Sequence, residues 1–139
     1  MTEHPNSLLI HHFLQAMTAG DRETLRALWS DDIIWYVKGN SPYEGEIKGA
    51  DNIFEYLAHL GDAAEFGSLG FHIEVEDILV SNNRAAALCN ATAARGDKTM
   101  QARHLLVARI IDRRIQSVTS VPVDPGRVEE FWRDNALPG

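Results

Sequence analysis

One histidine stands in a pattern that could move a proton. Between residues 99 and 111 the sequence alternates as a strand does, and His104 falls on one face of it with Ala102, Leu106 and Ala108. An imidazole among apolar neighbours loses hydration, which lowers its pKa and keeps it neutral near pH 7. Such a ring could act as an acid/base. The alternative is a structural histidine that hydrogen-bonds Ser117 or Thr119 on the neighbouring strand.

The remaining polar groups predict less chemistry. Ser117 and Thr119 could orient a ligand oxygen or could be structural hydroxyls. Cys89 is the only cysteine and is interpreted as a packing residue, because no base lies near it in the sequence. His11 and His12 are adjacent on a helix, so they diverge by about 100° and do not chelate one metal. We expect no metal site and no cofactor.

Three N-terminal helices, five strands and a short last helix are expected to position these residues. Helices are predicted at 7–19, from Asp21 to about Trp29, and at 50–60, because apolar residues recur at three- and four-residue spacing. Strands follow from β-branched or alternating runs at 33–37, 71–80, 84–94, 99–111 and 114–123. The run 84–94 is so rich in alanine that propensity alone favours a helix, but two turns bound it. Asp124 and Pro125 predict a short last helix.

Composition limits the partners. The 139 residues, 45% of them hydrophobic, suffice for one domain over 1–139. The net charge of −7 comes without a basic patch, which argues against nucleic acid. No apolar run approaches the roughly 20 residues that cross a bilayer, and the N-terminus does not resemble a signal peptide. We therefore expect a cytoplasmic protein that does not bind membranes.

The order of motifs resembles the nuclear transport factor 2-like superfamily, and within it the SnoaL-like group with polyketide cyclases and ketosteroid isomerases. The resemblance rests on Ala19-Gly20-Asp21, Leu28-Trp29-Ser30-Asp31-Asp32, the run from Gly39 to Gly45, and Val123-Asp124-Pro125. It implies an α+β cone in which a curved antiparallel sheet wraps around three N-terminal helices and encloses a pocket. It also implies a homodimer through the outer face of the sheet.

The superfamily frame implies which residues face the pocket. Aromatic Trp35 and Tyr43 would form a wall at its mouth, although core packing is an equal reading for Trp35. The other lining positions implied are Phe13, Met17, Val37, Phe54, Leu57, Ala87, Cys89, Ala91, Ala102, His104, Leu106, Ala108, Ser117, Thr119 and Val121. A bulge would invert the list for its strand.

The same frame argues against the best-known reactions of the superfamily. The ketosteroid isomerase tyrosine and two aspartates correspond to Phe13, Leu106 and Val37, so no base or oxyanion donor remains. The arginine and aspartate of limonene-type epoxide hydrolases correspond to Cys89 and Ala91. Isomerisation of that type and epoxide hydrolysis are therefore not expected.

Three functions stay open. The chain could be a cofactor-independent cyclase, dehydratase or isomerase acting on an apolar ketone-like or polycyclic substrate, with His104 as acid/base. It could instead be a carrier or sensor of a small apolar molecule. Finally, it could be a dimeric scaffold whose own side chains fill the cone. Small residues at 87, 89 and 91 favour the first two, because they leave volume unfilled.

Overall fold

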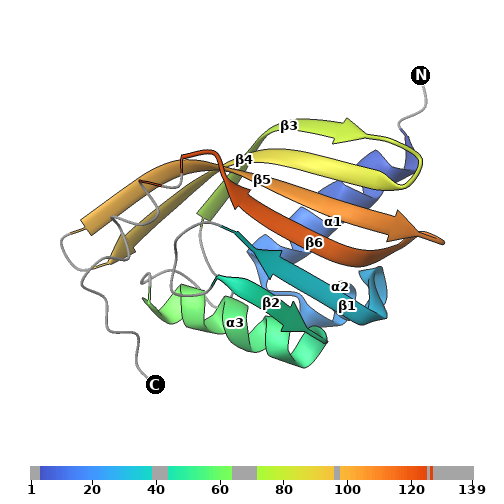
Figure 1. Cartoon of the computed structure of the whole chain (residues 1–139), viewed down its shortest axis with the longest axis horizontal. Coiled ribbons are helices and arrows are strands. Elements are labelled where there is room, and N and C mark those ends of the chain that lie inside the picture. Colours follow the sequence, from blue (N-terminus) through green and yellow to red (C-terminus); the bar gives the residue numbers. More distant parts are fainter. Residues whose placement is uncertain (1–3, 39–43, 64–71, 96–97, 125, 127–139) are drawn as a thin grey trace.

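The architecture is α+β, with helices on one side of a curved sheet (Figure 1). The computed structural model describes residues 4–38, 44–63, 72–95, 98–124 and 126. The elements are α1 (Pro5–Ala19), α2 (Arg22–Leu28), β1 (Trp29–Val37), β2 (Gly45–Lys48), α3 (Ala50–Ala63), β3 (His72–Val80), β4 (Arg84–Arg95), β5 (Lys98–Ile111) and β6 (Arg114–Pro122).

The first two helices meet at a turn that the sequence predicted. Gly20 adopts a left-handed φ of 70°, and its N–H donates to carbonyls at the end of α1. Asp21 then caps α2, since its carboxylate accepts the backbone N–H of Thr24. The Gly20-Asp21 pair thus ends one helix and starts the next.

The sheet has six strands in the order β2-β1-β6-β5-β4-β3. It is mixed, because β1 runs parallel to β6 while every other neighbouring pair is antiparallel. The expectation of a purely antiparallel sheet is therefore wrong at this one pairing. The prediction also missed β2, since four residues with exposed ends give too short an alternation to recognise.

The alanine-rich segment is a strand, as predicted. β4 pairs along its length with β5 and with β3 on its other side, so its backbone groups are satisfied in the ladder. Helix α1 contacts β3 and β4, and Ala85 and Ala87 are fully buried. Small side chains let a helix lie close to the sheet here, which overrides the helical propensity of alanine.

The helices cover one face of the sheet, called the inner face below. Helix α1 crosses the half formed by β3 and β4, and α3 packs on β1 and β2. The short helix expected after Asp124 lies outside the described residues. None of the helices that the structure describes is long and apolar enough to cross a membrane.

Candidate functional site

The register of β4 and β5 fixes the position of His104. Residues directly opposite each other on paired strands share a face, and His104 lies opposite Cys89. Cys89 is 1% exposed and Leu106, the next residue on this face of β5, is 4% exposed. His104 therefore lies on the same face of β5 as Leu106, which is the face that the helices cover.

His104 lies on β5 at the point where the neighbouring strand β6 ends. It pairs with Pro122, the last residue of β6, while β5 and β4 continue beyond that point (Figure 1). The backbone N–H of Val123 donates to the Arg103 carbonyl, so His104 and Pro122 form a non-hydrogen-bonded pair. Side chains approach most closely in such pairs. The imidazole therefore lies between Cys89 on one strand and Pro122 on the other.

The protonation of His104 follows from its surroundings. The ring is half-buried, and its Nδ1 has no hydrogen-bond partner among the residues that the structure describes. Burial lowers the pKa of His104 below its usual value of 6.5. A backbone hydrogen bond with Ala102 raises the pKa, but by less than burial lowers it. The imidazole is thus neutral at pH 7. Its Nδ1 is not engaged by Ser117 or Thr119, the partners of the structural alternative.

Those two hydroxyls lie on the other face of the sheet. Ser117 is opposite Arg109 and Thr119 is opposite Val107, on the side away from the helices. The reason is a register shift in β6 directly after Ile115. Ile115 is fully buried on the inner face, but beyond the shift the residues that a simple alternation from Ile115 would place inward face outward. The inner face of β6 instead carries Val118, Ser120 and Pro122, and the predicted inward positions Ser117, Thr119 and Val121 are corrected.

The other predicted lining residues come together as a packed core. One contiguous cluster, every member at most 6% exposed, contains Phe13, Met17, Trp35, Val37, Phe54, Leu57, Cys89 and Leu106. This core includes Phe13, Val37 and Leu106, to which the resemblance assigns the acid/base positions of ketosteroid isomerases, and all three are buried and apolar. Tyr43 lies outside the described residues.

Aromatic rings occupy the end of this core near α1 and α3. Phe13 lies 6.3 Å from Trp29 and 6.1 Å from Trp35, measured between ring centroids. Trp29 stacks on Phe54 at 5.3 Å, and Trp35 lies 6.2 Å from Tyr56. The Nε1 atoms of both tryptophans are buried without a hydrogen-bond partner among the described residues, as is Nδ1 of His104. The predicted lining residues did not include Trp29, which the sequence placed at the end of the second helix, or Tyr56.

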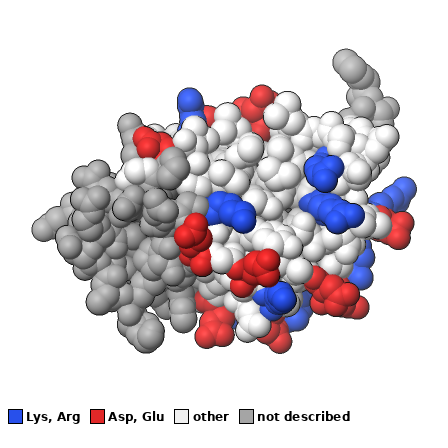
Figure 2. All heavy atoms as spheres, in the orientation of Figure 1, with Lys and Arg blue, Asp and Glu red and all other residues white. Residues whose placement is uncertain are grey.

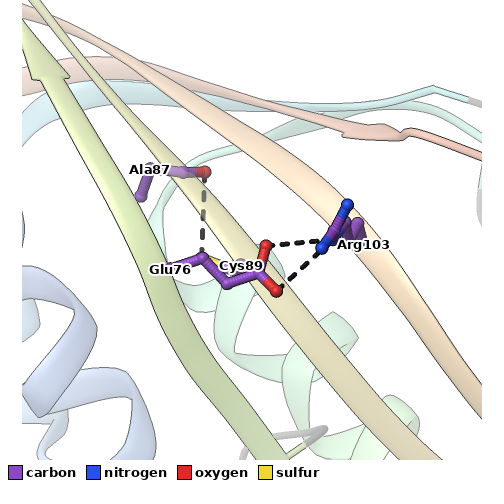
Figure 3. A network of polar contacts seen from close by, with 4 residues as sticks. All are labelled: Glu76, Ala87, Cys89 and Arg103. Atoms are coloured by element: carbon purple, nitrogen blue, oxygen red, sulfur yellow. Dashed lines mark hydrogen bonds and ion pairs between the residues drawn. The ribbon is translucent and has the colours of Figure 1, made fainter.

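Cys89 is a packing residue. Its Sγ contacts the Ala87 carbonyl oxygen at 3.8 Å, and burial raises the pKa of the thiol to about 11, with a further contribution from Glu76 (Figure 3). A thiol with this pKa is protonated near pH 7 and is a poor nucleophile. On the opposite side of the sheet, the Glu76 carboxylate forms an ion pair with Arg103 at 3.0 Å.

Described residues line hollows with volumes of about 380, 320 and 330 Å³. The largest lies between the start of β1 and the start of α3, and the second lies beside α1. The third borders Glu76 and Arg103 on the outer side. His104 lines none of these three, so the enclosed pocket stays a prediction. The described residues also contain no cluster of three potential metal ligands.

Comparison with known proteins identifies the family. A family model described as a SnoaL-like domain matches residues 10–118. The chain belongs to the SnoaL-like domain family. No curated protein matches this SnoaL-like chain in sequence.

Solved structures agree with the fold. Bal32a from a soil-derived mobile gene cassette superposes with a TM-score of 0.85 at 25% identity, over 93% of this chain and 97% of that one. A Xanthomonas campestris protein of unknown function with a cystatin-like fold gives 0.81 at 21% identity, over 94% and 98%. TerC co-crystallised with polyporic acid gives 0.79 at 15% identity, over 92% and 98%. The SnoaL-like fold predicted from the sequence is confirmed.

Proposed function

We propose that this SnoaL-like protein binds a small apolar molecule at the His104 end of the inner face and transfers a proton on it. The reaction class would be that of a cofactor-independent cyclase, dehydratase or isomerase on a ketone-like or polycyclic substrate. One observation carries the proposal: a half-buried, neutral imidazole stands in an otherwise apolar row, with a buried Nδ1 that has no partner among the described residues.

The chemistry of the proposed step needs only the imidazole. The unprotonated ring nitrogen of the neutral imidazole accepts a proton from the carbon next to a carbonyl, which leaves an enolate and an imidazolium. The imidazolium then returns a proton to carbon or oxygen. The Ser120 hydroxyl, which is half-buried on the inner face opposite Leu106, is the candidate to orient the ligand oxygen.

A simple ketone tests this proposal without knowledge of the natural substrate. 1-Tetralone exchanges the protons next to its carbonyl with D2O through the enolate, and NMR follows the exchange. We expect the protein to accelerate it and His104→Ala to remove about 100-fold of the acceleration. His12→Ala, which changes an exposed histidine on α1, is the control and should keep the wild-type rate. Equal rates with and without protein would contradict proton transfer.

A carrier or sensor is the second candidate. Phe13, Val37 and Leu106 are buried and apolar where ketosteroid isomerases have acids, which suits binding without chemistry. TerC was crystallised with polyporic acid, so that compound is a suitable probe. Calorimetric binding of polyporic acid together with no acceleration of 1-tetralone exchange would favour the carrier.

A scaffold is the third candidate, favoured by the aromatic packing around Phe13 and Phe54. A scaffold should bind neither probe.

For any of the three functions we propose a cytoplasmic location, because the only cysteine is a buried free thiol and a reducing compartment suits it.

We also propose that the outer face of the sheet binds a second copy of the chain. Leu79 is 62% exposed there, and its neighbours on the same face are half-buried although apolar. The set comprises Tyr36, Leu79, Leu88, Leu105, Val107 and Val121. An exposed apolar band of this kind is typical of an interface.

A further inference from the structure

The hollow of about 320 Å³ lies between the first two turns of α1 and the turn that joins β5 to β6. Its wall on the helix includes Pro5, Leu8 and Leu9, which share one face of α1 because they are three or four residues apart. Leu8 is 54% exposed. Figure 1 shows the start of α1 and the β5–β6 turn at the same end of the molecule. An exposed apolar wall of this kind suits the apolar part of a small ligand.

The wall opposite the helix carries a positive charge. Arg113 is exposed, and among the residues that the structure describes its guanidinium has no ion pair. The other two hollows contain carboxylates, Asp31 and Asp51 in one and Glu76 and Asp124 in the other, whereas no acidic residue is among those that line this one. In Figure 2 several Lys and Arg side chains lie at the right-hand end of the molecule, where Figure 1 places the turn. In a chain of net charge −7, this hollow is therefore suited to an anion.

The backbone holds Arg113 in an unfavourable conformation. Ile111 pairs with Arg114, so the turn has only two residues, Asp112 and Arg113, with left-handed φ values of 51° and 62°. A two-residue turn with both φ values positive prefers Asp-Gly, and a long side chain at its second position destabilises it. Strained positions of this kind persist where the side chain has a use. The turn is thus a second indication, independent of the charge, that Arg113 binds something.

The helix wall of the hollow is fixed to the sheet. Asn6 is 7% exposed, and its Nδ2 donates to the carbonyl oxygen of Ser81 at 2.7 Å, which joins the first turn of α1 to the turn after β3. His4 caps the same helix, since its Nδ1 accepts the backbone N–H of Asn6 at 3.0 Å. With its first turn held in this way, α1 keeps Leu8 and Leu9 in place, so the hollow exists before a ligand binds.

We propose that this hollow binds a small apolar carboxylate, with the carboxylate on the Arg113 guanidinium and the apolar body on Leu8 and Leu9. The planar guanidinium offers two parallel N–H groups to the two carboxylate oxygens. The volume is near the lower end of the roughly 300–1,000 Å³ of small-molecule sites, which suits one compact molecule. The site is separate from the His104 end, because Ile111, where β5 ends, lies roughly 20 Å along the strand from His104.

The probe is 2-naphthoate, and 2-naphthylmethanol, which has the same rings without the charge, is its matched control. Titrations are followed by the backbone amide signals in NMR. We expect naphthoate to shift the signals of the first two turns of α1 and of the β5–β6 turn. It should bind about tenfold more tightly than the alcohol, because it adds hydrogen bonds between charged groups. Equal affinities for the two compounds, or no binding of naphthoate to the wild type, would contradict the proposal.

Arg113→Gly separates binding from folding. Glycine suits the left-handed second position of the turn, so the melting temperature should rise by about 2–5 °C while naphthoate binds about tenfold more weakly. Asp112→Gly is the matched control, because it relaxes the other left-handed residue and keeps the guanidinium; it should bind naphthoate at least as tightly as the wild type. His104→Ala should also bind it normally. Wild-type affinity in Arg113→Gly would overturn the proposal, and loss of binding in His104→Ala alone would place naphthoate at the His104 end instead.

Discussion

The two ends of the inner face have similar side chains and different packing. At one end, Ala85, Ala87 and Ala108 are fully buried within the contiguous core, beside a helix that contacts β4. At the other end, Cys89 and Ala102 still belong to that core, whereas Ala91 is buried outside it and His104 is only half-buried. Small residues therefore accommodate a helix at the first end and surround a titratable ring at the second.

This difference in packing limits the earlier inference that small residues on the inner face leave unfilled volume for a ligand. Alanines on an inner face leave room for whatever packs on them, and at the Ala85 end this is α1, which contacts β4. Only the His104 end keeps a polar ring among small residues. On the inner face, a ligand site is consequently expected at that end alone.

The largest expected effect is a difference in the free energy of unfolding between substitutions at the two ends of the inner face. Phe13→Ala removes a fully buried ring from the aromatic cluster and should lower the free energy of unfolding by about 3–5 kcal/mol. His104→Ala should lower it by less than about 1 kcal/mol, because it removes a half-buried ring with a buried nitrogen that lacks a described partner. Urea denaturation measures both. Equal losses would mean that the His104 end is packed as tightly as the Phe13 end.

Overpacking gives the next effect. Ala87→Leu adds volume under α1 and should destabilise the fold by about 1–3 kcal/mol. Ala91→Leu should cost clearly less and should weaken binding of polyporic acid, because it fills the proposed ligand site. Thermal melts and calorimetry measure the two consequences. If Ala91→Leu were the more destabilising substitution, the contrast between the ends would be wrong.

A smaller effect tests the corrected face of β6. Ser120 is on the inner face and Ser117 is on the outer face. Loss of one hydrogen bond of about 1 kcal/mol predicts roughly fivefold weaker binding of 1-tetralone by Ser120→Ala. Ser117→Ala should bind it as the wild type does, and titration by NMR compares them. Weaker binding by the Ser117 variant only would restore the original assignment.

The sequence was most informative where alternation is unbroken. The inner row of β5 follows directly from the pattern around His104, because the β4–β5 ladder runs without a register shift. The face of β6 did not follow, since the shift after Ile115 leaves no mark in a hydrophobic pattern. β2 was missed for its shortness, and the parallel pairing of β1 with β6 joins segments that are far apart in sequence.

The central claim is that a neutral His104 lines the ligand site. Histidine NMR, assigned with His104→Gln, measures the pKa of this ring with and without 1-tetralone. We predict a pKa below 6.5, the direction that burial gives, and a clear shift of the His104 signals when the ketone binds. Because a base must be neutral to accept a proton, tetralone exchange should be constant above that pKa and fall below it. A pKa above 6.5 together with signals that the ketone does not move would contradict the account.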